Sequence, residues 1–156
     1  MKIKPQALLV SIGIPLLVGG LSALLSGGGM AAFSMLQKPP LSPPGWLFPV
    51  VWTILYVLMG IASYLVYTAD ADQQEISRAL IAYGLQLFFN FFWSILFFRF
   101  GWYFFSFLWL AVLWALILLT IRLFAAIDKR AAYLLIPYLI WVTFAGYLNL
   151  GIALLN

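Results

Sequence analysis

The stretch FGWYFFSFLWLAVLWALILLTI, residues 100–121, lies between Arg99 and Arg122 and contains 22 residues without a charge. A helix that crosses the roughly 30 Å hydrocarbon core of a bilayer needs about 20 apolar residues, because each adds about 1.5 Å. The stretch does not alternate apolar and polar residues as the strands of a membrane β-barrel do, so helices are favoured over a barrel. It therefore predicts one membrane-spanning helix.

Charged residues divide the rest of the chain in the same way. Four further uncharged stretches are 20 to 33 residues long, and each accommodates one helix but not comfortably two. The predicted fold is an all-α integral membrane protein, a single domain over residues 1–156 built as a five-helix bundle. We expect spans near residues 6–26, 45–68, 79–99, 102–124 and 131–154.

The composition supports a bilayer as the solvent. Of the 156 residues, 66% are hydrophobic and 8% are charged, whereas a soluble domain carries about 25% charged residues. The chain contains no cysteine and no histidine, which excludes disulfides, thiol nucleophiles, zinc sites and imidazole bases; we expect neither a metal nor a required cofactor. Its eight Lys and Arg residues are scattered, so nucleic acid is not an expected partner.

The first span and the first loop each have a second interpretation. Lys2 and Lys4 precede an apolar run, as in a signal peptide, but the run is longer than a normal signal core, which favours a retained helix. Residues 27–44 form a long loop, in which glycines argue against a stable helix and four prolines favour an extended chain; such loops are commonly lids. Ser42 before two prolines is typical of a helix start.

The remaining connections are short or polar. Residues 69–77 are the only acidic stretch and are expected to form a solvated loop. The connection Arg99-Phe100-Gly101 is so short that the third and fourth spans must be antiparallel neighbours. Six basic residues lie on the side where the first span begins and two on the other. This charge bias predicts a cytoplasmic N-terminus, an extracytoplasmic C-terminus and first loop, and favours a bacterial plasma membrane.

Acid–base chemistry inside the membrane is excluded. The four acidic residues, Asp70, Asp72, Glu75 and Asp128, all fall in predicted loops. A proton-coupled pump needs a titratable group at membrane depth, and a membrane protease needs a base beside its nucleophile. The polar side chains inside the later spans are amides, hydroxyls and phenols, which orient a ligand but do not exchange protons easily near neutral pH.

Three helical faces combine aromatic side chains with amides. Residues three or four positions apart share a face of a helix, and such faces are often simply core. Buried amides either bond a neighbouring helix or face a cavity, and both interpretations stay open. Trp46, Trp102, Tyr103 and Tyr133, at span ends, fit an interface belt. The three faces are Phe48, Trp52 and Tyr56; Gln86, Asn90, Trp93 and Phe97; and Tyr138, Trp141, Ala145 and Asn149.

Several motifs together resemble one family. They are Lys38-Pro39, Pro43-Pro44-Gly45-Trp46, Val51-Trp52-Thr53 with Tyr56 and Met59-Gly60, then Gln86, Asn90 and Trp93, and finally Pro137-Tyr138, Trp141, Phe144-Ala145 and Leu148-Asn149. This pattern is similar to bacterial members of the tryptophan-rich sensory protein or translocator protein family, also called the peripheral benzodiazepine receptor family. The resemblance covers essentially the whole chain, with five spans in register.

The resemblance implies a function as well as a fold. Family members bind porphyrin-like tetrapyrroles and isoquinoline or benzodiazepine drugs in a pocket closed by the first loop, and they are commonly homodimers. By resemblance Trp52, Phe48, Asn90, Trp93, Trp141 and Ala145 would line the pocket, with Pro43 and Leu148 nearby. The helical faces add Tyr56, Gln86, Phe97 and Tyr138. The expected function is a membrane receptor or sensor, with a tetrapyrrole such as protoporphyrin as ligand.

Two other functions stay open. Some bacterial members are reported to promote light-dependent porphyrin breakdown through pocket tryptophans, and Trp52 and Trp141 match those positions, although no residue is a certain catalytic one. A transporter of tetrapyrroles or lipids would have to work without proton coupling. The chain also departs from the family. Ala32 and Phe33 replace a common Trp-Tyr pair, and Leu150 and Leu154 replace the cholesterol motif of animal members, so specific cholesterol binding is not expected.

Overall fold

The computed structural model describes residues 3–27 and 29–156, and within them five helices are long and apolar enough to cross a membrane. The protein is therefore an integral membrane protein with the predicted five-helix architecture. A short π-helical segment, η1 (Ile95–Arg99), continues the third of these helices. The five are α1 (Pro5–Leu25), α3 (Leu47–Tyr67), α4 (Gln73–Ser94), α5 (Tyr103–Ile127) and α6 (Lys129–Leu155).

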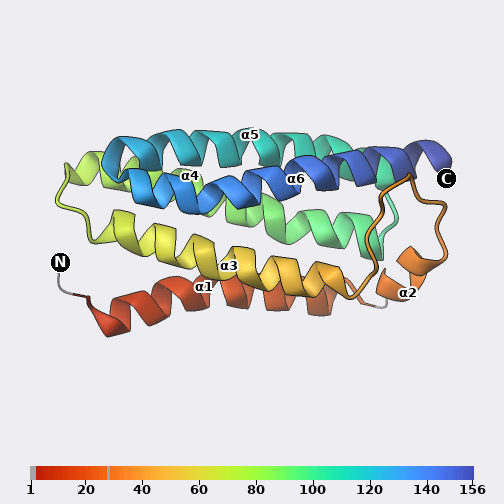
Figure 1. The fold of residues 1–156 in the computed structure, drawn as a ribbon, viewed down its shortest axis with the longest axis horizontal. Coiled ribbons are helices and arrows are strands. Elements are labelled where there is room, and N and C mark those ends of the chain that lie inside the picture. The colour runs from red at the N-terminus through yellow and green to blue at the C-terminus, as the bar shows by residue number, and fades with distance from the viewer. Residues whose placement is uncertain (1–2, 28) are drawn as a thin grey trace.

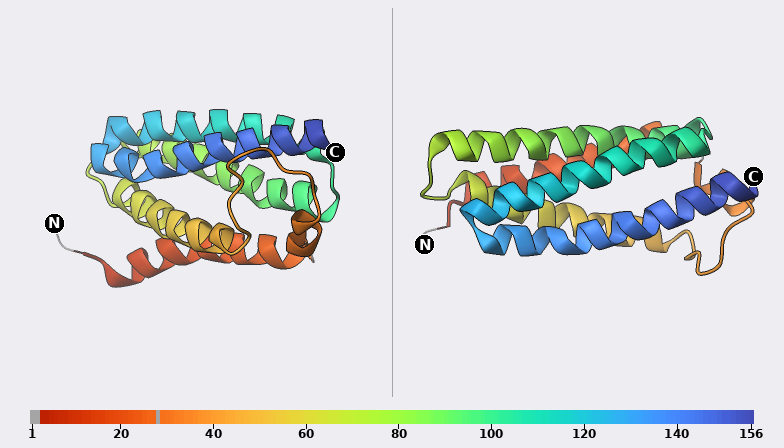
Figure 2. Two further views of the ribbon diagram at one scale, coloured as in Figure 1. Left: turned by 45° about the vertical axis from the view of Figure 1, so that its right-hand side comes forward. Right: turned by 90° about the horizontal axis from the view of Figure 1, so that it is seen from above.

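The helices lie side by side along the long axis of the molecule (Figure 1). Going around the bundle, α1 contacts α3, α3 contacts α6, α6 contacts α5, α5 contacts α4, and α4 contacts α1. The left view of Figure 2 shows α1 and α5 on opposite sides of the bundle, and in the right view α5 lies in front of α1. The α4/α5 pair is antiparallel, as its short connection predicts, and the Trp109 indole of α5 donates to the Phe89 carbonyl of α4 at 2.7 Å.

Two glycines let α1 and α3 approach closely. A Cβ atom at Gly60 would overlap the backbone of Ile12 and lie 2.7 Å from the Ser11 carbonyl oxygen. A Cβ atom at Gly19 would overlap the Tyr56 ring. Gly19 therefore packs against α3, because its missing side chain leaves room for the buried Tyr56 ring.

The first loop contains a helix that the sequence did not predict. The short helix α2 (Gly29–Ser34) interrupts the region 27–44, which was expected to lack a stable helix. Gly27, just after the end of α1, has a φ of 66°, whereas Gly29 is the first residue of α2. Phe33 anchors α2 by packing on Phe48 with ring centroids 5.3 Å apart. Tertiary packing therefore outweighs the local propensity.

The expected cap at Ser42 is wrong. The helix α3 begins at Leu47, and the Ser42 hydroxyl donates instead to the Pro39 carbonyl at 2.8 Å. A residue before a proline is disfavoured in the helical conformation, so Pro43 and Pro44 delay the helix. The first turn-forming bond runs from the Leu47 amide to the Pro44 carbonyl.

The acidic stretch 69–77 is only partly a loop. Helix α4 begins at Gln73, so Glu75 lies in its first turn rather than in a connection. Acidic residues are favourable at a helix N-terminus, where the backbone amides carry partial positive charge. Ile76, which is 3% exposed, fixes this turn against the core. The side chains of Asp70, Asp72 and Glu75 are all exposed.

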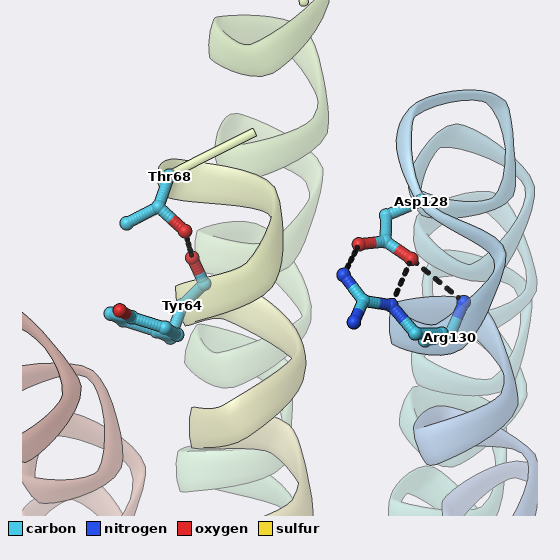
Figure 3. A network of polar contacts seen from close by, with 4 residues as sticks. All are labelled: Tyr64, Thr68, Asp128 and Arg130. Atoms are coloured by element: carbon cyan, nitrogen blue, oxygen red, sulfur yellow. Dashed lines mark hydrogen bonds and ion pairs between the residues drawn. The ribbon is translucent and has the colours of Figure 1, made fainter. Parts of the chain in front are cut away.

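Each end of the bundle is closed by local contacts. At the end shown in Figure 3, Arg130 forms an ion pair with Asp128 between α5 and α6, and the Thr68 hydroxyl donates to the Tyr64 carbonyl. At the other end the Asn156 side chain exchanges two hydrogen bonds with the backbone of Gln37 in the first loop. The loop is thus fastened to the C-terminal end of α6.

Three of the four residues predicted for the interface belt are exposed. Trp46, Trp102 and Tyr133 are exposed at helix ends, as side chains of an interface belt have to be. Tyr103 differs, because it is only partly exposed and packs on Phe97 at a centroid distance of 5.1 Å.

Candidate ligand-binding site

A cluster of aromatic rings forms where α3 faces α4 and α6. Trp52 of α3 stacks on Tyr56, one turn later, with ring centroids 5.5 Å apart. Trp52 also lies 6.4 Å from Trp93 of α4 and 6.1 Å from Tyr138 of α6. Residues four positions apart on α3 thus place two rings on one side, as the helical period predicts.

A buried polar network crosses the bundle behind these rings. The Tyr56 hydroxyl donates to Asn90 Oδ1 at 3.0 Å, and Asn90 Nδ2 donates to the Tyr138 hydroxyl at 2.6 Å. The Tyr138 hydroxyl in turn donates to Gln86 Oε1 at 2.6 Å. Gln86 Nε2 is 4.0 Å from the sulfur of Met59. This chain of contacts links α3, α4 and α6. We call it the Tyr56–Met59 network after its two end residues; its five members are Tyr56, Asn90, Tyr138, Gln86 and Met59.

The third buried amide, Asn149, accepts a hydrogen bond from an indole. Trp93 Nε1 donates to Asn149 Oδ1 at 2.9 Å, and Asn149 Nδ2 donates to the Tyr103 carbonyl at 2.7 Å. Gln86, Asn90 and Asn149 are each at most 3% exposed, which confirms that the amides face the interior. Because its N–H is already paired, Trp93 has only its ring to offer a ligand.

A cavity of about 350 Å³ adjoins the aromatic cluster. Its walls come from α1, α3 and α4, including Phe98 of η1, and α6 does not contribute. Phe48, Trp52, Tyr56 and Trp93 supply rings, and Asn90 supplies the central amide. The remaining lining residues are Leu16, Gly19, Gly20, Ser22, Ala23, Ser26, Gly27, Pro49, Thr53, Ser94 and Phe98.

The polar groups around this cavity are already paired with one another. Ser22 Oγ donates to the Phe91 carbonyl at 2.7 Å, and Ser26 Oγ donates to the Ser22 carbonyl at 2.7 Å. Ser94 Oγ lies 3.0 Å from Ser26 Oγ, and it must be the donor there because Ser26 has a single proton. The cavity therefore presents mainly apolar surface, with the second lone pair of Asn90 Oδ1 as a further acceptor site.

Five of the twelve predicted site residues lie together in the cavity wall: Phe48, Trp52, Tyr56, Asn90 and Trp93. Three more are one contact away. Gln86 and Tyr138 belong to the Tyr56–Met59 network, and Phe97 stacks on Trp93 at 5.6 Å.

The other four predicted residues lie outside this wall. Trp141 packs edge-on against Phe48 at 5.8 Å, and its buried Nε1 has no partner among the described residues. Ala145 and Leu148 are buried in α6. Pro43 lines a separate cleft of about 500 Å³ formed mainly by the first loop, together with Phe33, Lys38 and Trp46. Ala32 lies in α2, and its side chain is outside the described part of the chain.

Helix α1 contributes a wall that the sequence reasoning missed. Seven lining residues between Leu16 and Gly27 come from α1 or directly follow it, and most of them are glycine, alanine or serine. Small side chains carry no aromatic or amide signal, so a search for chemically distinctive residues passes over them. A signal was nevertheless present, because Gly19 and Ala23 form a small-residue pair of the kind that permits close helix contact.

Several known proteins are similar in sequence to this chain over most of its length. The TspO/MBR family pattern matches residues 11–155. The chain is 40% identical over 124 residues to the tryptophan-rich protein TspO of Chlorobaculum tepidum, covering 80% of this chain and 78% of that protein. It is 35% identical over 138 residues to protein CrtK of Rhodobacter capsulatus, covering 88% and 85%. It is also 35% identical over 129 residues to the translocator protein of Ovis aries, covering 80% and 75%.

The fold agrees with these matches. Most of α1, the four helices α3 to α6, the aromatic face of α3 and the amides of α4 fall within the matched region. The chain belongs to the TspO/MBR family of integral membrane proteins.

Proposed function

We propose that this protein is a membrane receptor or sensor that binds flat aromatic molecules, tetrapyrroles and isoquinoline-type or benzodiazepine-type compounds among them, in the cavity between α1, α3 and α4. One observation carries the proposal: the indoles of Trp52 and Trp93 and the phenol of Tyr56 line a single cavity. Aromatic faces stack on flat ligands, and a mostly apolar wall with few polar groups is typical of such sites.

The cavity volume indicates which of the possible ligands should bind more tightly. At about 350 Å³ it lies near the lower end of the roughly 300–1,000 Å³ range of small-molecule pockets. A compound of two or three fused rings fits this space without rearrangement, whereas a tetrapyrrole macrocycle requires the walls to move apart. We therefore expect tighter binding of the smaller compounds when both are compared in one membrane.

Equilibrium binding tests the proposal. Protoporphyrin IX and a labelled isoquinoline carboxamide are titrated into purified protein in lipid nanodiscs, and we expect saturable binding of both. Trp52→Leu should weaken both affinities at least about tenfold, because aromatic side chains at binding hot spots contribute about 2 kcal/mol or more. Trp114→Leu is the matched control, since Trp114 donates to Thr143 in a groove between α5 and α6 away from the cavity. Equal losses in both variants, or no saturation, would refute the proposal.

Light-dependent porphyrin breakdown is the second candidate function. The supporting observation is that three oxidisable rings, those of Trp52, Tyr56 and Trp93, adjoin the cavity with centroids 5.5 and 6.4 Å from Trp52. An indole in such a position can give one electron to a photoexcited porphyrin. Illumination should then remove the porphyrin absorption band faster with the wild type than with Trp52→Phe. Equal rates with both proteins would leave receptor binding as the function.

The membrane and the assembly are part of the same proposal. A bacterial plasma membrane with the N-terminus inside is supported by the bias of Lys and Arg toward the end where α1 begins. A homodimer is supported by Ala111 and Ala115, which are exposed one turn apart on α5 and leave a surface that a second copy can approach closely.

A further inference from the structure

The cavity has an edge built from small side chains that faces the bilayer. Gly20 and Ala23 of α1, with Pro49 and Thr53 of α3, line the cavity and are exposed at the same time. We call these four residues the α1–α3 mouth. Gly20 and Thr53 each lie more than one helical turn inside their own helix, so the mouth faces hydrocarbon rather than water.

The mouth is suited to contact with lipid. Thr53 is its one polar side chain, and its hydroxyl donates to the Pro49 carbonyl of its own helix at 2.7 Å. Such back-bonding leaves no unpaired polar side-chain group at the opening. An apolar molecule dissolved in the bilayer therefore meets an apolar rim.

Specific contacts hold two other sides of the cavity together. Ser22 and Ser26 fasten α1 to α4 through the Phe91 carbonyl and the Ser94 hydroxyl. At the loop end the Phe33 ring, 4% exposed, covers the cavity wall. It packs 5.3 Å from Phe48 and 6.0 Å from Phe98, both of which line the cavity.

Helix α1 can yield at the mouth. Pro15 lacks a backbone N–H, and the adjacent Gly19 and Gly20 lower the helix propensity of the following turn. The close contact between Ile12 and Gly60 precedes all three positions along α1. The first half of α1 is thus held against α3 at Gly60. Outward bending of the second half keeps that contact, but it has to release the packing of Gly19 on Tyr56 and the hydrogen bonds of Ser22 and Ser26 to α4.

We propose that ligands enter and leave the cavity sideways from the bilayer, through the α1–α3 mouth. Among the proposed ligands, this route serves the neutral, flat aromatic compounds that dissolve in lipid, such as those of the isoquinoline type. This inference rests on the proposed function, since a cavity that binds nothing needs no entrance. A side chain on the path but outside the final contacts changes the barrier to binding, so it slows association and dissociation together and leaves the affinity nearly unchanged.

The test measures both rate constants in proteoliposomes with a radiolabelled isoquinoline carboxamide as the probe. The test variant is Gly20→Phe, because a Cβ atom at Gly20 meets no other atom within 4 Å and the larger ring should be tolerated. Gly13→Phe is the matched control, since Gly13 is equally open, is exposed on the same face two turns earlier, and does not line the cavity. Ala23→Leu is a second test variant should Gly20→Phe unfold at a lower temperature than the control.

The expected result is a fall of about fivefold or more in both rate constants for the test variant, with Gly13→Phe and wild type alike. Unchanged rates in Gly20→Phe and Ala23→Leu would overturn the proposed route, as would faster dissociation with weaker affinity. Faster exchange in Phe33→Ala alone would place the entrance at the loop end and overturn it equally. Absence of saturable binding in the wild type would instead overturn the proposed function, and the route with it.

Discussion

Tyr138 is the residue through which α6 joins the polar network of α3 and α4. Its hydroxyl accepts from Asn90 and donates to Gln86, and its side chain is 1% exposed. A buried hydroxyl with both functions used is costly to remove, because two partner groups are left without a bond in an apolar environment.

We predict that Tyr138→Phe lowers the free energy of unfolding by about 1–3 kcal/mol, since it leaves Gln86 Oε1 without its donor and Asn90 Nδ2 without its acceptor. Thermal unfolding in detergent micelles measures the change. Tyr133→Phe is the control on the same helix, because Tyr133 is 69% exposed. The network is not a source of stability if the two variants unfold at the same temperature.

At the scale of helices, the closest approach between α1 and α3 depends on Gly60. We predict that Gly60→Ala destabilises the fold by about 1–3 kcal/mol, because the new methyl group would overlap the Ile12 backbone. It should also weaken ligand binding, since α1 forms a cavity wall. Both effects are measured by thermal unfolding and by titration of the isoquinoline carboxamide.

Gly84→Ala is the control for this prediction. A Cβ atom at Gly84 has no neighbour within 4 Å on α4, so alanine there should be neutral or stabilise the helix by up to about 1 kcal/mol. If Gly60→Ala is as harmless as Gly84→Ala, then the close packing of α1 on α3 described above is wrong.

The turn between α5 and α6 consists of Asp128, whose side chain accepts from the Arg130 amide and from its guanidinium. We predict that Asp128→Ala costs about 0.5–2 kcal/mol, as loss of a helix cap usually does, whereas Asp128→Asn retains a capping oxygen and costs less. Thermal unfolding of the two variants at neutral pH tests the difference.

The pH dependence of this turn has a definite sign. The hydrogen bonds and charge of Arg130 lower the pKa of Asp128 below its usual value. The contribution of Asp128 to stability is therefore full above the pKa of the unfolded chain and disappears as the pH falls through the lower folded value. The stability difference between wild type and Asp128→Asn should shrink on acidification. A difference that grows at low pH would contradict this account.

The sequence pattern predicts the long helices well and their connections poorly. Spans are set by the length of uncharged stretches, a property visible residue by residue, whereas α2 exists because Phe33 packs on Phe48 and Phe98, rings distant in sequence. The site was likewise predicted only in part. Helical periodicity groups Trp52 with Tyr56 and Asn90 with Trp93, but it does not show that α1 rather than α6 closes the cavity, because that depends on how helices pack.

For the whole molecule, the distribution of charge predicts one orientation. Lys4, Arg78, Arg122, Lys129 and Arg130 lie toward the end where α1 begins, and Lys38 and Arg99 lie toward the other; Lys2 is outside the described residues. We predict that a periplasmic reporter fused after Asn156 is active and that a cytoplasmic one is not. The reverse result would show that the protein has the opposite orientation, with the first loop in the cytoplasm.

Chemical cross-linking in native membranes tests the proposed dimer at the same scale. We predict that a cysteine in place of Ala111 forms a disulfide between two copies on mild oxidation, because the chain has no other cysteine and Ala111 is exposed on α5. A cysteine at Ile81, exposed on α4, is the control. Cross-linking at Ile81 but not at Ala111 would move the interface to another face.

The most direct measurement is an experimental structure with a bound isoquinoline carboxamide. The ligand should lie between α1, α3 and α4, with its rings against Trp52 and Trp93 and with Gly19 on its far side, while Gly20 stays at the rim outside the ligand contacts. A ligand found in the groove beside Trp114 would contradict the central claim. So would a structure in which α1 fills the cavity and Trp52 faces the lipid.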